Sequence, residues 1–107
     1  MRKELIFEVS RYIERRDRKT STTYCIDYRE GNNRLSVEAD SVKELAEKFV
    51  KKRIYLELSG DYQIKNKTDN NFGREEGESE LEIGLSSEEY VDLFEKVTDL
   101  ENKSTEI

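Results

Sequence analysis

Apolar and polar residues alternate over the first third of the chain, which is the pattern of half-buried strands. The first such series runs through Leu5, Phe7, Val9 and Ile13, with Arg11 interrupting it. Residues 22–28 are rich in β-branched and aromatic side chains, and residues 35–39 alternate again. The charged segment 15–19 and the Gly- and Asn-containing segment 30–33 separate these series. We therefore expect three strands joined by two hairpin turns.

A helix is predicted directly after the third strand. Ser41 and Glu44 have the spacing of a capping box, in which the serine oxygen accepts a backbone N–H and the glutamate reaches back. Apolar residues then recur at helical spacing, at Val42, Leu45, Ala46, Phe49 and Val50. The basic residues near position 52 suit the negative pole of a helix that ends there.

The second half repeats this plan. Short strands are expected over 54–58, 62–64 and 81–85, with a mobile acidic loop over 66–79, where Phe72 is the one apolar residue. Ser86 and Glu89 form a second capping box. A second amphipathic helix then follows from the spacing of Tyr90, Leu93, Phe94 and Val97. Residues 101–107 are expected to be a flexible tail.

The predicted order is therefore βββα-βββα, which indicates the α+β class. We expect one domain over residues 1–100, with a mainly antiparallel sheet of about five to six strands and two amphipathic helices on one face. The other sheet face is solvated or used for binding. Its predicted side chains are Glu8, Tyr12, Glu38, Tyr55 and Glu57.

The amino-acid composition limits the classes of function that we expect for this chain. The 107 residues include no histidine and one cysteine, 41% are charged, and the formal net charge is −6. Without histidine, the commonest general base and metal ligand is missing, and Cys25 has no histidine partner. One cysteine cannot form an intramolecular disulfide, and no apolar run is long enough to span a membrane. We expect a cytoplasmic protein without catalytic residues, metal or cofactor.

Charge is divided by position. Residues 1–74 hold 17 of the 19 Lys and Arg residues and 13 of the 25 Asp and Glu residues, a balance of +4. Residues 75–107 hold the remaining 2 basic and 12 acidic residues, a balance of −10. The sequence thus predicts an acidic C-terminal third on a mildly basic body.

The acidic third contains the main candidate binding residues. These are Glu75, Glu76, Glu78, Glu80 and Glu82. On a strand, the glutamates at alternate positions would line one face, with about 7 Å between neighbours. Such a row could dock on a basic partner or hold a divalent ion. The structural alternative is the solvent face of an edge strand, where charges discourage aggregation.

A basic cluster offers an alternative nucleic-acid-binding site. It consists of Arg11, Arg15, Arg16, Arg18 and Lys19. Arginine can fork onto phosphates, and the neighbouring Tyr12 and Tyr24 could stack on bases. A solvated hairpin tip, or a surface for an acidic protein, explains the same residues.

From these features we hypothesise a non-enzymatic protein-binding module that acts through an acidic surface. Its partner would be a protein with a basic surface, such as a nucleic-acid-binding protein. Small acidic proteins of this style include viral inhibitors and other anti-defence proteins, such as anti-CRISPR proteins, as well as antitoxins and toxin-immunity proteins. A nucleic-acid-binding domain is the second hypothesis, and a homodimer would supplement the thin core.

Overall fold

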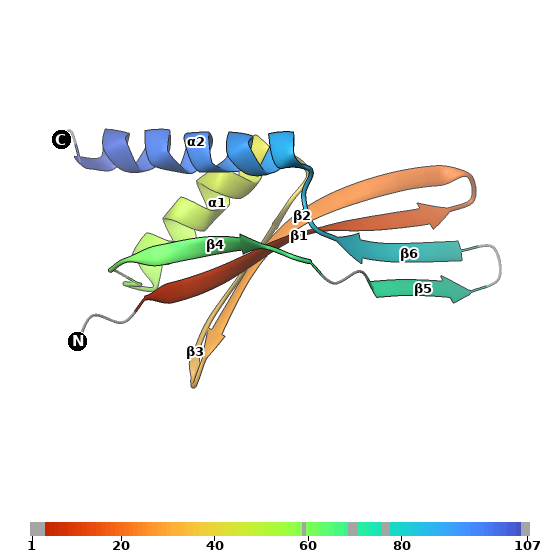
Figure 1. Ribbon diagram of the computed structural model, residues 1–107, viewed down its shortest axis with the longest axis horizontal. Helices are drawn as coiled ribbons and strands as arrows, with labels where there is room; N and C mark the ends of the chain where they lie inside the picture. Colours follow the sequence, from red (N-terminus) through yellow and green to blue (C-terminus); the bar gives the residue numbers. More distant parts are fainter. Residues whose placement is uncertain (1–3, 59, 69–70, 76–77, 106–107) are drawn as a thin grey trace.

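A computed structural model describes residues 4–58, 60–68, 71–75 and 78–105. These residues form six strands and two helices in the predicted βββα-βββα order, which confirms the α+β class (Figure 1). The elements are β1 (Leu5–Arg16), β2 (Lys19–Glu30), β3 (Asn33–Ala39), α1 (Val42–Tyr55), β4 (Tyr62–Asn66), β5 (Asn71–Glu75), β6 (Glu78–Ile83) and α2 (Ser87–Thr105).

The sheet is built around the long strand β1. The strand order is β3-β2-β1-β6-β5, and β4 also pairs with β1. One edge of β1 pairs with β2 in antiparallel register. The other edge is shared, because β4 runs parallel to Leu5–Val9 and β6 runs antiparallel to Arg11–Arg16. The sheet is therefore mainly antiparallel, as predicted, with β1 and β4 as its parallel pair.

Both helices lie over the same face of one half of the sheet (Figure 1). The core lies between the helices and the sheet. Its most deeply buried side chains, each at most 2% exposed, include Phe7, Val9, Ile26, Leu45, Phe49, Ile64, Leu93 and Val97. The other half projects beyond the helices. We call this half the arm, and it consists of β5, β6 and the segments 11–16 of β1 and 19–24 of β2 that lie next to them. The arm gives the molecule its length of 50 Å.

The helices begin where their capping residues predict. Ser41 is the N-cap of α1, and its hydroxyl accepts the Glu44 N–H at 3.2 Å. At α2 the box is reciprocal, because Ser86 Oγ accepts the Glu89 N–H at 3.2 Å and Glu89 Oε1 accepts the Ser86 N–H at 3.0 Å. The buried face of α1 contains the apolar residues that the sequence assigns to it. Local sequence therefore fixes both helix starts.

The strand expected over 54–58 was wrong. The helix α1 continues through Tyr55, and Ile54 is 63% exposed. The helix ends in a Schellman arrangement, in which the Leu58 N–H bonds to the Arg53 carbonyl and Glu57 has a φ of 56°. Tyr55 and Glu57 consequently do not lie on the sheet face predicted for them. The run of helix formers before Ile54 continues the helix, and this outweighs a three-residue alternation.

Two segments expected to be irregular are regular in part. Residues 71–75 of the predicted loop form β5, which pairs with β6 so that Phe72 stands opposite Leu81. The predicted tail begins inside α2, which continues to Thr105. Glu101 accepts hydrogen bonds from Arg53 at 2.7 Å and from Tyr62 at 2.6 Å. These long-range bonds stabilise the part of the helix beyond Leu100. They cannot be predicted from the local sequence pattern.

Candidate functional site

The sheet face opposite the helices gathers carboxylates from four strands. Successive side chains of a strand point to opposite faces, so the buried residues Phe7 and Val9 place Glu8 on this open face. The register then adds Asp27, which pairs with Glu8, and Glu80, which pairs with Glu14. We call the resulting group the acidic face. Its members are Glu8, Glu14, Asp27, Glu38, Glu80 and Glu82.

Cys25 lies at the centre of the acidic face. In the register it stands between Ser10 of β1 and Glu38 of β3. Ser10 is 3% exposed, and its hydroxyl donates to Glu82 Oε1 at 3.3 Å. Burial, followed by the charges of nearby carboxylates such as Glu38, raises the pKa of the Cys25 thiol to about 11. The thiol therefore experiences a negative potential from the carboxylates around it.

The acidic face continues onto the arm. Arg16 forms ion pairs with Glu14 and, at 3.9 Å, with Glu80, which stand opposite each other in the register. A hydrogen bond to Glu80, followed by burial and the charge of Glu80, raises the pKa of Tyr12 to about 12. One arginine thus bridges two carboxylates, and the potential near Tyr12 stays negative.

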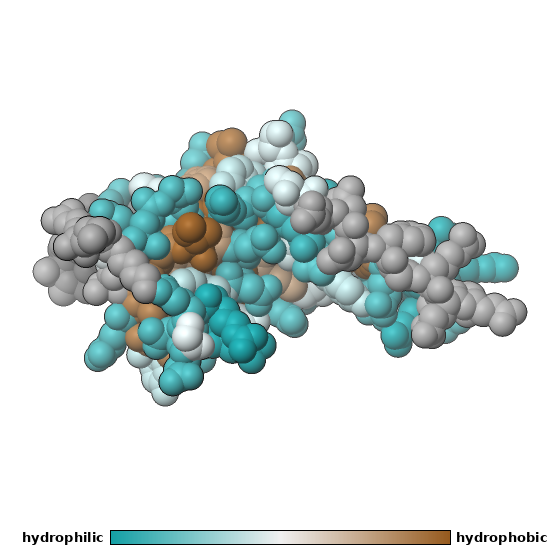
Figure 2. Space-filling model, turned by 60° about the horizontal axis from the view of Figure 1, so that its bottom comes forward, coloured by the Kyte–Doolittle hydropathy of each residue, from teal (hydrophilic) through white to brown (hydrophobic). Residues whose placement is uncertain are grey.

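Basic residues flank the acidic face. Lys65 stands opposite Glu8 in the register, and Lys67 Nζ lies 3.9 Å from Glu8. At the far end of the β2–β3 hairpin, Arg29 pairs with Arg34. Figure 2 views the molecule from below Figure 1, where hydrophilic residues predominate and hydrophobic colour is confined to small separate areas. Alternation with Leu5 and Phe7 also places Ile6, which is 49% exposed, on this face. The face is therefore an acidic band between basic ends, with Ile6 as an exposed apolar side chain.

Of the predicted acidic row, Glu80 and Glu82 lie on this face. Glu75 and Glu78 pair with each other where β5 and β6 meet. The side chains of Glu75, Glu76 and Glu78 lie outside the described part of the chain. Glu14 and Asp27 are further members of the acidic face that no sequence pattern had marked as site residues. The register of the β1–β2 hairpin could have found them, because its two-residue turn fixes which residues stand opposite each other.

The predicted basic cluster is not gathered in space. Arg11 points to the helix side, where Arg11 Nε donates to the Gly84 carbonyl at 3.0 Å and its guanidinium pairs with Glu89 at 3.2 Å. Arg15 and Arg16, as neighbours in a strand, point to opposite faces. Arg18 lies in the turn and Lys19 begins β2. The alternation of β1 therefore divides these charges between two faces.

The Arg11 interruption in the first apolar series has a structural role. Glu89, at the start of α2, accepts the Tyr24 hydroxyl at 2.6 Å as well as pairing with Arg11. Burial opposes ionisation of Glu89, but hydrogen bonds from Tyr24 and Ser86 and the Arg11 charge together lower its pKa. The charged Glu89 thus links α2 to β1 and β2 where the arm begins.

This arrangement suits recognition of charge. The raised pKa keeps the Cys25 thiol protonated near neutral pH, which makes it a weak nucleophile. Within the ranges that the structure describes, no group of His, Cys, Asp or Glu residues is placed to hold a metal ion. No helix there is long and apolar enough to cross a membrane.

Comparison with known proteins gives no further assignment. No protein-family model matches the chain, and no curated protein or solved structure matches it significantly.

Proposed function

We propose that this chain is a non-enzymatic protein-binding module whose acidic face docks on a basic surface of another protein. The observation that carries the proposal is the gathering of six carboxylates from four strands on one open sheet face. Two of them, Glu80 and Glu82, belong to the acidic third of the sequence. The other four come from the segment with a positive balance.

Physical chemistry favours a charged partner. A face with few apolar residues offers little hydrophobic driving force, so its affinity would depend on complementary charge and hydrogen bonds. A concentration of carboxylates accelerates encounter with a basic surface, and salt weakens that effect. The partner is therefore expected to carry clustered Lys and Arg residues and to release the chain as salt increases.

Many basic protein surfaces hold nucleic acid. A rigid acidic face that occupied such a surface would exclude the nucleic acid, so the proposed action is inhibition. Occupation of that kind would suit an anti-defence inhibitor, an antitoxin or an immunity protein, and this proposal does not choose among them. The nucleic-acid-binding alternative is less well supported, because Arg11 and Arg16 are both engaged by carboxylates of the chain.

The test is a triple charge reversal on the acidic face, Glu8→Lys, Glu38→Lys and Glu80→Lys. These side chains lie on three different strands. The wild-type chain and the variant are immobilised, and host lysate is passed over them at low and at high salt. Mass spectrometry then quantifies the captured proteins. We expect the wild type to capture a basic protein that the variant does not retain.

A matched control reverses three carboxylates of α2, Glu88→Lys, Glu95→Lys and Asp99→Lys. All three are exposed on the helix layer, and the change in net charge equals that of the first variant. The control should retain the partner if the acidic face is responsible. If both variants lost the partner equally, binding would depend on the net charge of the chain and not on the acidic face. If the face variant captured the same partner and kept its melting temperature, the acidic face would not be the binding surface.

A further inference from the structure

The outer edge of β3 is a second candidate binding feature. β3 is the last strand in the sheet order, and no strand in the described part of the chain pairs with its outer edge. Glu30 and Asn33 close the two-residue turn of the β2–β3 hairpin. In an antiparallel ladder the hydrogen-bonding direction alternates. The backbone groups of Arg34, Ser36 and Glu38 therefore point away from β2.

A side chain contact supports this direction. Lys48 Nζ of α1 donates to the carbonyl oxygen of Glu38 at 2.8 Å, from the side opposite β2. Such lysines are a common protection for sheet edges. Lys48 covers one end of the outer edge, and the outward N–H and C=O groups of Arg34 and Ser36 extend beyond it.

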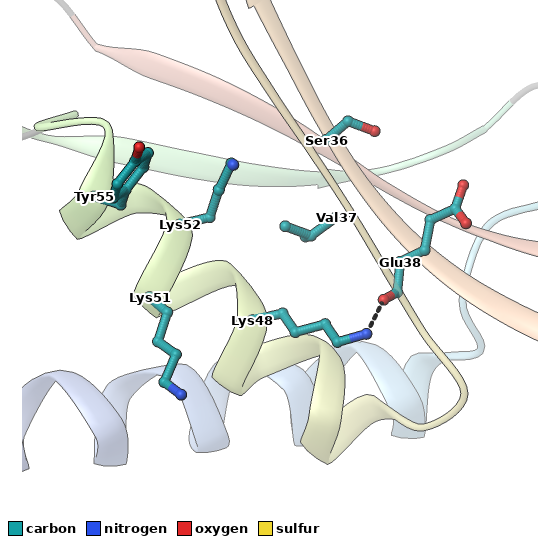
Figure 3. Close-up of a pocket in the computed structure, with 7 residues that line it drawn as sticks. All are labelled: Ser36, Val37, Glu38, Lys48, Lys51, Lys52 and Tyr55. Atoms are coloured by element: carbon teal, nitrogen blue, oxygen red, sulfur yellow. Dashed lines mark hydrogen bonds between the residues drawn. The ribbon is translucent and has the colours of Figure 1, made fainter.

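A groove runs between this edge and α1. Its volume is about 500 Å³, and its walls are residues 36–38 of β3 and Lys48, Lys51, Lys52 and Tyr55 of α1. Figure 3 shows Val37 pointing from β3 toward the helix and Lys48 reaching across to Glu38. Tyr55 is 78% exposed at one end of the groove. We call this feature the edge groove.

The edge groove is basic although the whole chain is acidic. Lys48 pairs with Glu44 at 3.1 Å. Lys52 is exposed, and its Nζ lies 5.3 Å from the centre of the Tyr55 ring. Lys51 is exposed and has no ion-pair partner among the residues that the structure describes. Lys52 is therefore available to an anionic ligand near the unpaired strand edge, while Lys51, which points away from β3 in Figure 3, adds positive charge to this flank of α1.

We propose that the edge groove binds an extended acidic peptide segment of a partner protein, which adds to β3 as a further strand. Backbone pairing with Arg34 and Ser36 would provide part of the affinity, because a peptide offers both donors and acceptors. Side chains of an added strand alternate, so every second one faces α1. Glutamate or aspartate at those positions would meet Lys52 and would be attracted by the charge of Lys51 on the same flank of α1. This site does not depend on the acidic face.

Charge argues against a second copy of the chain as the occupant. Two antiparallel copies of β3 centred on Ser36 would place Arg34 opposite the partner copy's Glu38, which is favourable. The same two-fold symmetry would bring the lysine-rich flanks of both α1 helices toward each other. An acidic peptide brings no second set of lysines to the groove, so it avoids that repulsion and meets the positive charge already there.

Nucleic acid is also a poorer fit. Phosphates would satisfy the lysines, but they supply acceptors only. The outward carbonyl of Ser36 would then lack a donor. An extended peptide satisfies both kinds of backbone group at this edge.

The test uses a fluorescent peptide in which glutamate alternates with valine, titrated with the full chain and followed by anisotropy. We expect binding with protection of the Ser36 amide from hydrogen exchange. The double variant Lys51→Glu and Lys52→Glu should weaken binding by at least about tenfold. A matched control, Lys43→Glu and Lys65→Glu, changes the charge equally outside the groove and should bind as the wild type does.

A peptide N-methylated at alternate amides separates backbone pairing from charge attraction, because it keeps its carboxylates but loses donors to the edge. We expect it to lose binding. Equal binding of this peptide, or equal displacement by oligothymidine, would overturn the proposal. So would absence of binding up to about 1 mM peptide. Sedimentation provides a last check. If the chain formed a dimer, and if the double lysine variant dimerised more strongly, the edge would bind a second copy and the proposal would be wrong.

Discussion

Asn66 and Leu85 form a side chain-to-backbone pair that joins the two strands sharing one edge of β1. Asn66 Nδ2 donates to the Leu85 carbonyl at 2.8 Å, and the Leu85 N–H donates to Asn66 Oδ1 at 2.7 Å. Asn66 is the last residue of β4, and Leu85 follows β6. The amide thus satisfies backbone groups at the point where β1 changes from one neighbour to the other.

This pair leads to the first prediction. Asn66→Asp keeps the acceptor for the Leu85 N–H but removes the donor to its carbonyl, so it should lower the free energy of unfolding by about 1–3 kcal/mol. Asn66→Ala removes both bonds and should cost at least as much. Urea unfolding provides the measurement, with the exposed Thr68→Ala as control. A loss no larger than that of Thr68→Ala would show that the pair contributes little.

Gly84 leads to a second prediction at the same junction. A Cβ atom at this position would lie 2.2 Å from the Lys67 carbonyl oxygen and 2.8 Å from Asn66 Oδ1. The first contact is with backbone, which cannot move without disturbing the pairing of Lys67 with Val9. Gly84→Ala should therefore lower the unfolding free energy by about 2 kcal/mol or more, measured in urea. A stability equal to the wild type would contradict the close packing of these chain segments.

Two residues with positive φ lead to a third prediction. Arg18 has a φ of 66° in the β1–β2 turn, and Glu57 has a φ of 56° after α1. Glycine adopts this region without the strain that a Cβ imposes. We expect Arg18→Gly and Glu57→Gly each to stabilise the chain, by up to about 1 kcal/mol. Thermal unfolding tests this, and Gly31→Ala, at a φ of 57°, should do the reverse.

Cys25 reports the potential of the acidic face, which gives a fourth prediction. Burial and the carboxylates around it raise its pKa to about 11, so its alkylation near neutral pH should be slow. Negatively charged iodoacetate should react more slowly, relative to neutral iodoacetamide, than it does with the unfolded chain. Glu38→Gln removes the largest of the carboxylate charges that act on the thiol and should reduce that discrimination. Identical ratios in the folded and unfolded chains would show that the face carries no net field.

Alkaline stability is the fifth prediction. The pKa of Cys25 rises from 9.0 to about 11 on folding, so its contribution is present below pH 9 and is lost as the pH rises toward 11. Burial, then the bond to Glu101, raises the pKa of Tyr62, which acts in the same direction above pH 10. Urea midpoints should fall from pH 9 upward, and Cys25→Ser should reduce the fall between pH 9 and about 11. An equal fall in Cys25→Ser would assign the loss to the tyrosines.

The elements with strong local signals could be predicted from sequence. Both helix starts follow from Ser41 and Ser86, because a capping box acts between residues three positions apart. The first three strands follow from alternation with period two. The end of α1 and the strand β5 could not be predicted in this way. The first depends on the Schellman bonds after Tyr55, and the second depends on pairing with β6.

The candidate sites, too, could be predicted from the sequence only in part. The sequence alone determined the absence of histidine, the acidic C-terminal third and the side of each strand on which a carboxylate falls. Only the tertiary structure decided that Glu80 and Glu82 join Glu14 and Asp27, while the carboxylates of α2 lie on the other layer. It also placed the lysines of α1 beside the edge of β3. The reason is that strand register and helix docking bring together residues distant in sequence, whereas patterning acts over a few neighbouring residues.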